Sequence, residues 1–272
     1  MRTAEIAGAA GLMLLLGGCS PSPARLLRQA EARWREGNYE DAIRLNRLLY
    51  NRDREGGYGA AALMNIGNIY YLNLRQLKDA IETYSQLAQE FPGRPEEFKA
   101  RRQLASIYAN EIGDLTQAIY EYNRILEFSD LEDRSDVEYQ RARVRFQQGD
   151  YDTALRELRH IEEEGASGHL AHQVYLKIGN IYQVQKKYED AVGCFERVTG
   201  SPCIDCRRRA HIHLMEAYEA LFDFDRAIEA VRGLDPGPEN NETVEREVKR
   251  LIEKQHRLDS GKSPPWLGSH PR

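Results

Sequence analysis

The stretch from Gly179 to Phe195, GNIYQVQKKYEDAVGCF, decides the fold of this chain. It sets two small residues, Gly179 and Ala191, on either side of a polar turn, and an aromatic residue, Tyr188, precedes the alanine by three positions. A small residue lets two helices approach closely, and the aromatic ring fills the wedge that the turn opens. Gly or Asn in such a turn permits a positive φ. The stretch therefore predicts two helices joined by a tight turn.

The same pattern recurs along most of the chain. Related segments surround six alanines spaced 36 to 38 residues apart: Ala42, Ala80, Ala118, Ala154, Ala191 and Ala227. An aromatic residue or a leucine lies three positions before each alanine, at Tyr39, Leu77, Leu115, Tyr151, Tyr188 and Phe224. A bulky apolar residue follows each by seven positions, at Leu49, Leu87, Ile125, Ile161, Val198 and Leu234. Such a period predicts one repeated supersecondary unit.

This repeat resembles the tetratricopeptide repeat, a helix-turn-helix unit of about 34 residues. The resemblance covers residues 24–236 and implies an all-α superhelical solenoid of about six repeats. The longer spacing implies that some helices or turns are extended. No segment alternates like a strand, and clusters of Gly and Pro fall where the repeats should meet.

The part of the chain after the repeats is expected to end the solenoid. Residues 237–259 are expected to form a capping helix with one apolar stripe, because a terminal repeat has no neighbour to cover its outer face. The stripe consists of Val244, Val248, Leu251 and Ile252. Residues 260–272 are rich in Pro, Gly and Ser, and this composition predicts disorder.

The N-terminal segment predicts a compartment. The apolar run from Ile6 to Leu16 is 11 residues long. A transmembrane helix needs about 20 apolar residues, so the run fits a secretory signal instead. The sequence from Leu16 to Cys19 resembles the lipobox of bacterial lipoproteins.

The lipobox resemblance implies a signal peptide at 1–18, a lipid on Cys19 and a short tether at 19–23. By the same resemblance, Ser20 implies the periplasmic face of the outer membrane. Two acyl chains or more make such an anchor stable. The alternatives are an ordinary signal peptide with a chance cysteine and a soluble cytoplasmic adaptor.

The net charge of −5 shows no basic excess, which argues against nucleic acid as a partner. No catalytic Ser-His-Asp order, glycine-rich phosphate loop or His-Glu-x-x-His motif is present. The sequence therefore predicts a protein that is not an enzyme and that carries no cofactor beyond the lipid.

One cysteine pair could form a redox site, a metal site or a disulfide. Cys203 and Cys206 form a Cys-x-x-Cys pattern with His211 and His213 nearby, which can be redox-active or bind metal. An all-helical chain lacks the strand–helix context of a thioredoxin-like site, and Arg207 stands where covalent haem attachment needs histidine. In an oxidising periplasm we expect a disulfide between Cys203 and Cys206 and no metal, although Cys194 leaves the pairing of the three thiols open.

The groove offers the second candidate site. Ile-Gly-Asn-Ile-Tyr occurs at 66–70 and at 178–182. In some peptide-binding tetratricopeptide proteins, such an asparagine belongs to a carboxylate clamp with a lysine four residues earlier. Asn68 and Asn180 match that asparagine, whereas Met64 and Leu176 replace the lysine. Equivalent or adjacent positions hold three cations, at Arg102, Arg143 and Lys177. They predict a groove for an acidic or C-terminal peptide group; the alternative is ordinary solvated charge.

With its expected lipid anchor, long repeats and no extra domain, this chain resembles BamD, the lipoprotein subunit of the barrel-assembly machine. That family binds the barrel-inserting subunit and incoming barrel proteins. The resemblance implies a scaffold that holds envelope proteins together in outer-membrane protein assembly. Six repeats after a lipobox also resemble type IV pilotins, which help secretin rings assemble, and the periplasmic repeat protein of the Tol–Pal system is a third relative. A metal- or thiol-dependent protein centred on Cys203 and Cys206 is the hypothesis from another class.

Overall fold

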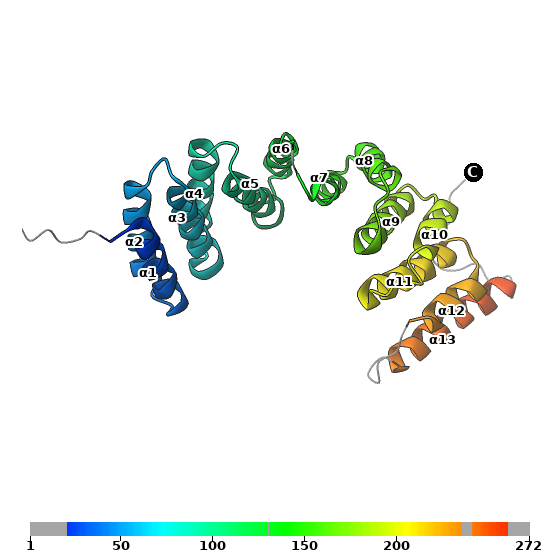
Figure 1. The fold of residues 1–272 in the computed structure, drawn as a ribbon. Coiled ribbons are helices and arrows are strands. Elements are labelled where there is room, and N and C mark those ends of the chain that lie inside the picture. The colour runs from blue at the N-terminus through cyan, green and yellow to red at the C-terminus, as the bar shows by residue number, and fades with distance from the viewer. Residues whose placement is uncertain (1–20, 130, 235–240, 261–272) are drawn as a thin grey trace, which may run out of the picture. The chain divides into compact units, whose positions relative to one another are not determined.

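The structure of the protein is a computed structural model, which describes residues 21–129, 131–234 and 241–260 (Figure 1). These residues form helices and turns without a strand, so the all-α prediction is confirmed. The first helices of the six pairs are α1 (Pro23–Arg35), α3 (Gly57–Asn68), α5 (Pro95–Ile107), α7 (Arg134–Gln148), α9 (Gly168–Val184) and α11 (Ile204–Ala220). The second helices are α2 (Tyr39–Arg52), α4 (Leu77–Glu90), α6 (Leu115–Leu126), α8 (Tyr151–Glu163), α10 (Tyr188–Glu196) and α12 (Phe224–Arg232).

The chain divides into two compact units, one ending at Ala100 and the other beginning at Arg101. The predicted signal peptide and Cys19 lie outside the described residues. Within the part of the chain that is described, no helix is both long and apolar enough to span a bilayer.

The repeated alanines explain why each pair packs closely. All six are fully buried: Ala42, Ala80, Ala118, Ala154, Ala191 and Ala227. The aromatic or leucine residue three positions earlier is the first residue of each second helix. At the far end of the first five of these helices, or just beyond it, the bulky residue seven positions after the alanine is also fully buried: Leu49, Leu87, Ile125, Ile161 and Val198. The repeat pattern in the sequence is therefore the pattern of contacts between paired helices.

The turn within each pair places one residue at positive φ, five positions before the repeated alanine. Gly113 and Gly149 adopt φ values of 80° and 86°, which glycine accepts without steric strain. The expected Gly or Asn is absent from three of the six turns. Arg75, Lys186 and Phe222 occupy them with φ values of 55°, 59° and 61°. A side chain at such a φ is strained by about 1–2 kcal/mol.

Two of the first helices account for part of the long repeat period. α3 runs on into η1 (Ile69–Leu74), and α5 runs on into η2 (Tyr108–Ile112); both additions are π-helical. The wider turn ends where the Gln76 N–H donates to the Tyr70 carbonyl at 2.9 Å. Such turns insert residues without ending the helix, because the hydrogen bonds shift to a longer reach.

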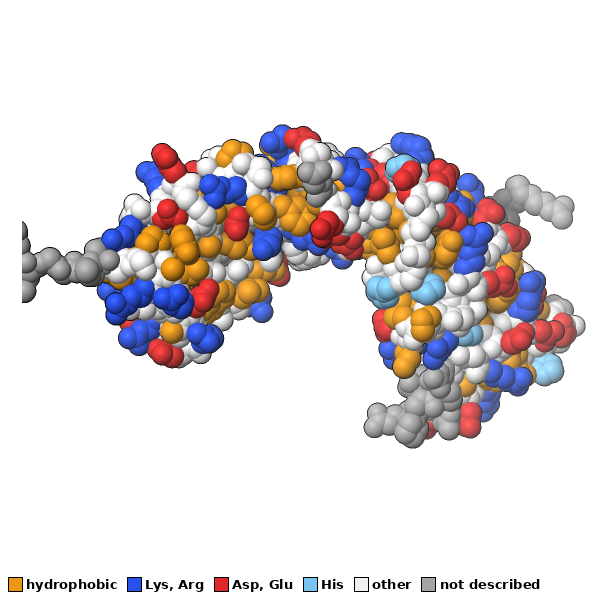
Figure 2. Space-filling view, in the orientation of Figure 1, with side chains coloured by type: hydrophobic (Ala, Val, Ile, Leu, Met, Phe, Trp, Pro, Cys, Tyr) orange, Lys and Arg blue, Asp and Glu red, His pale blue; other side chains and the backbone are white. Residues whose placement is uncertain are grey.

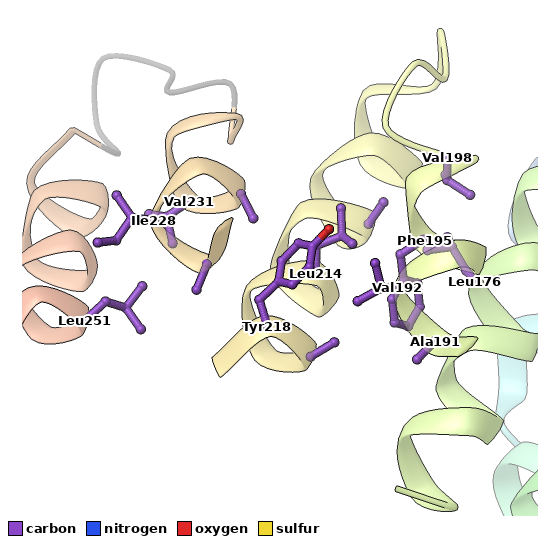
Figure 3. Close-up of a cluster of buried hydrophobic side chains, with 14 of the residues drawn as sticks. Leu176, Ala191, Val192, Phe195, Val198, Leu214, Tyr218, Ile228, Val231 and Leu251 are labelled. Atoms are coloured by element: carbon purple, nitrogen blue, oxygen red, sulfur yellow. The ribbon is translucent and has the colours of Figure 1, made fainter. Parts of the chain in front are cut away.

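A last helix, α13 (Asn241–Asp259), covers α12 at the end of the second unit. Leu251 of α13 is fully buried and lies beside Ile228 and Val231 of α12 (Figure 3). The Arg250 guanidinium donates to both carboxylate oxygens of Glu219 on α11, at 2.9 and 2.8 Å. Of the predicted capping segment 237–259, positions 237–240 lie outside the described residues, as does the predicted disordered tail beyond 260.

Candidate functional site

The two predicted clamp asparagines occupy equivalent places in different units. Gly67 lies beneath the ring of Tyr84, and the Tyr84 hydroxyl donates to Asn68 Oδ1 at 2.7 Å. Burial raises the pKa of Tyr84. Asn68 in the first unit is therefore already engaged within its own repeat.

In the second unit, Gly179 lies beneath Phe195 in the same way. Phenylalanine carries no hydroxyl, and the buried Asn180 Oδ1 has no hydrogen-bond partner among the described residues. Asn180 therefore keeps an acceptor that Asn68 has already used.

Three cations of the second unit lie together on neighbouring first helices. They are Arg143 on α7, Lys177 on α9 and Arg209 on α11, and we call them the basic cluster. α9 contacts both α7 and α11. The charges of Arg209 and Arg143 both act on Lys177 and on the buried Tyr139, which places the four side chains in one region. Arg143 and Lys177 were predicted for the groove, whereas Arg209 was not.

Lys177 is less exposed than Arg209. Its ammonium lies 4.5 Å from the centre of the Phe146 ring. Burial, followed by the charges of Arg209 and Arg143, lowers the pKa of Lys177 to about 8. Across the described residues, no carboxylate forms an ion pair with Arg143, Lys177 or Arg209. The three cations of the basic cluster therefore have no ion-paired carboxylate among the described residues; Asp136, whose charge also acts on Tyr139, pairs with Arg102 instead.

Arg102, the remaining predicted groove residue, is in a different situation. Its guanidinium lies 2.5 Å from Asp133 Oδ2 and 3.5 Å from Asp136 Oδ2, at the start of α7. These carboxylates neutralise Arg102 and fix α5 against the loop before α7. Arg102 therefore has its anionic partners within the protein.

The three described cysteines are free thiols, so the disulfide between Cys203 and Cys206 is not formed here and stays a prediction. Cys203 caps the start of α11, and its sulfur accepts from the Cys206 N–H at 3.2 Å. Cys194 packs into the core between α7, α8 and α9.

The two histidines that the sequence placed near the cysteine pair have other contacts. His213 stacks on Phe195 with ring centres 5.1 Å apart, and it lies 3.2 Å from Glu216. His211 lies against Gly233. The structure instead brings His169 of α9 to the cysteines.

The first unit also contains a hollow of about 330 Å³, between α2, α3 and α4. Its lining contains one cation, Arg47, and two carboxylates, Asp79 and Glu82. Arg47 donates to the Tyr70 hydroxyl at 2.9 Å. The mixed charges give this hollow no preference for a ligand of one sign.

The chain is similar to known proteins in sequence and in fold. The tetratricopeptide repeat family matches residues 27–95 and 69–132. Tetratricopeptide repeat protein 36 of Homo sapiens is 31% identical over 134 residues, which cover 48% of this chain and 68% of that protein.

Three solved structures share the fold at low sequence identity. The C-terminal part of a TPR repeat-containing protein from Cytophaga hutchinsonii has a TM-score of 0.67 and 15% identity, covering 86% of this chain and 88% of its own. PilW, a type IV pilus biogenesis factor, has a TM-score of 0.58 and 12% identity, covering 85% and 98%. YrrB, a TPR protein with an unusual peptide-binding site, has a TM-score of 0.50 and 15% identity, covering 78% and 92%. Repeats, buried alanines and relatives agree that this chain belongs to the tetratricopeptide repeat family.

Proposed function

We propose that this chain is a lipid-anchored scaffold that binds acidic peptide segments of envelope proteins on the basic cluster, without catalysis. The basic cluster carries the proposal, because its three cations lie on adjacent helices and none of them forms an ion pair with a carboxylate among the described residues. A peptide carboxylate would supply that charge and form charge-assisted hydrogen bonds. Lys177 gains most from such a partner, since it holds its charge in a poorly solvated place.

The neighbourhood of the basic cluster suits the C-terminus of a peptide. Asn180 Oδ1 is buried and unpaired, so it would accept from a peptide N–H once the side-chain amide turns outward, and the Phe146 ring offers an apolar surface beside Lys177. Extended concave surfaces are the usual binding surfaces of helical repeats. We therefore assign Arg143, Lys177, Asn180 and Arg209 to the peptide site.

Peptide binding can be measured by fluorescence anisotropy with a labelled acidic peptide that has a free C-terminus. We expect Lys177→Met and Arg209→Ala each to weaken binding at least about tenfold, since each removes a charge-assisted contact of about 1.5–3 kcal/mol. Arg156→Ala is the matched control, because Arg156 is an exposed cation of the second helix α8. Equal affinity in all four proteins would refute the site.

For the biological setting, we propose the periplasmic face of the outer membrane, with an acyl anchor on Cys19 and a role in outer-membrane protein assembly. The lipobox-like segment and the resemblance to BamD support this proposal. A role in secretin or pilus assembly is the second candidate, and the similarity of fold to PilW favours it.

In-cell crosslinking followed by membrane purification and mass spectrometry separates these settings. Barrel-assembly subunits among the crosslinked proteins would support the first, and secretin or pilus components would support the second. A Cys19→Ser variant should leave the membrane fraction. If wild-type protein is released without detergent, the lipid anchor is wrong.

A further inference from the structure

Three metal-ligating side chains meet at one edge of the second unit. They are His169, Cys203 and Cys206, and one ligand atom from each lies within 4.8 Å of the other two. Cys206 Sγ lies 3.5 Å from His169 Nδ1. Cys206 is buried, Cys203 is half-buried and His169 is exposed. The group is therefore fixed on one side and open to solvent on the other.

The fold holds these three residues in place from two helices. Cys203 precedes α11 as its capping residue, and Cys206 follows in the first turn of that helix. This spacing of three directs both sulfurs to the same side of the helix. His169 belongs to the first turn of α9, which packs against α11. Figure 2 shows histidine side chains over this α9 and α11 region of the surface.

The loop that carries Cys203 is itself fixed by hydrogen bonds. The Cys203 N–H donates to Ser201 Oγ at 3.1 Å, and Ser201 Oγ lies 3.0 Å from His172 Nδ1. Ser201 is only 1% exposed, and Arg207 donates to its carbonyl at 2.9 Å. The backbone N–H of Cys206 points at Cys203 Sγ. Metal sites commonly have such an outer layer of contacts, which orients the ligands.

We infer that His169, Cys203 and Cys206 form a binding site for a zinc ion, in place of the disulfide expected from the sequence. Two thiolates and an imidazole suit Zn²⁺, whereas Mg²⁺ and Ca²⁺ prefer oxygen ligands. Tetrahedral zinc has bonds of about 2.3 Å to sulfur and 2.0 Å to nitrogen, which holds such a pair about 3.5 Å apart. This matches the separation between Cys206 and His169.

Binding is a ligand exchange without electron transfer. Each thiol releases its proton as its sulfur bonds to zinc, and His169 coordinates through Nδ1 with its proton on Nε2. The two thiolates cancel the charge of the ion, so the site as a whole is neutral. Because His169 is exposed, water takes the fourth position. The ion joins the starts of α9 and α11 and ties the fifth repeat to the sixth.

The first test uses purified, reduced full-length protein and metal alone. Titration with Co²⁺ should give a thiolate-to-cobalt charge-transfer absorption that saturates at one ion per chain, and Zn²⁺ should displace it. Zn²⁺ should also raise the thermal midpoint of the wild-type protein. Because both readouts use wild-type protein, they do not depend on the folding of any variant.

Variants then identify the ligands. Cys203→Ser and Cys206→Ser should abolish the cobalt band, and His169→Ala should weaken zinc binding at least about tenfold. Cys194→Ala and His160→Ala are the matched controls, because Cys194 lies in another part of the core and His160 is an exposed histidine on α8. Both should bind zinc like the wild type.

Three results would overturn the site. The first is wild-type protein that binds no cobalt or zinc after full reduction. The second is a cobalt band that survives in Cys203→Ser and Cys206→Ser. The third is a disulfide between Cys203 and Cys206 in protein alkylated directly in the cell, since a disulfide leaves no thiolate for the metal.

Discussion

Gly67 and Gly179 show how one missing side chain sets the distance between two helices. A Cβ on Gly67 would lie 2.5 Å from the Tyr84 ring, and one on Gly179 would lie 2.4 Å from the Phe195 ring. Both rings are fully buried and cannot move aside. We expect Gly67→Ala and Gly179→Ala to lower the free energy of unfolding by about 1–3 kcal/mol, as overpacked cores do.

Gly193 provides the matched control for this prediction. It lies within α10, where an added Cβ meets nothing within 4 Å. Gly193→Ala should therefore raise the free energy of unfolding by about 0.5–1 kcal/mol, since alanine has the higher helix propensity. Urea denaturation of the three variants compares the two effects. A gain in stability for Gly179→Ala would show that the helices can separate.

The hydroxyl of Tyr84 and its absence from Phe195 predict a pair of opposite effects. Tyr84→Phe should destabilise the protein by about 1 kcal/mol, because Asn68 loses the donor 2.7 Å from its oxygen. Phe195→Tyr should stabilise it by about 1 kcal/mol by supplying a donor to the buried Asn180 Oδ1. Thermal unfolding measures both. The gain should vanish in an Asn180→Ala background; if it persists there, the hydroxyl has found another partner.

Single residues also show what the sequence could predict. The six alanines and the rings before them follow from spacing alone, because any close helix pair needs a small residue at that place. Arg209 gave no such signal, since a run of three arginines, Arg207 to Arg209, near the start of a helix resembles solvated charge. His169 was missed for a different reason. Its cysteine partners lie in the next repeat, and only the packing of α9 on α11 brings the groups together.

At the scale of the element, α13 shows how the last repeat is closed. Leu251 is fully buried against α12, whereas its neighbour Ile252 is 36% exposed. We expect Leu251→Ala to lower the free energy of unfolding by about 2–5 kcal/mol, the usual range for a buried leucine. Ile252→Ala should have a much smaller effect. Chemical denaturation tests this contrast, and equal losses would mean that α13 packs with a different face.

The sequence predicts some helical elements better than others. The stripe of Val244, Val248, Leu251 and Ile252 is enough to predict α13 from the sequence, because helical periodicity marks the buried face of a helix. The π-helical ends η1 and η2 were not foreseen in that form. The sequence showed only that the period was long. It could not show whether the extra residues widen a helical turn or lengthen a loop, because the choice depends on packing between repeats.

At the scale of the whole molecule, the charge of Lys177 makes stability depend on pH. The folded protein releases this proton near pH 8, whereas an unfolded lysine holds it to about 10.5. Between these values the unfolded state binds more protons, so stability rises with pH. Lys177→Met should therefore stabilise the protein at pH 7, and the difference from wild type should shrink toward pH 10. Urea titrations at several pH values measure this difference in the free energy of unfolding.

The same titration bears on binding. Deprotonation of Lys177 removes one charge from the basic cluster, so affinity for an acidic peptide should fall as the pH rises through about 8. The charged groups that act on Lys177 from α7 and α11 are Arg143 and Arg209. An affinity that is flat from pH 6.5 to 9.5 would show that the peptide does not contact Lys177.

The turns at Arg75, Lys186 and Phe222 are three places where substitution by glycine could raise the thermal stability of this protein. Glycine would relieve about 1–2 kcal/mol of strain at each turn. Against this gain, glycine would lower the free energy of unfolding by about 0.5–1 kcal/mol, because it gives the unfolded chain more conformational freedom. The balance is a small gain at three separate places, and distant gains add. The turns with glycine show that the architecture already accepts the change. An engineer seeking a heat-tolerant version could therefore begin with exposed turns and leave the core and the basic cluster untouched.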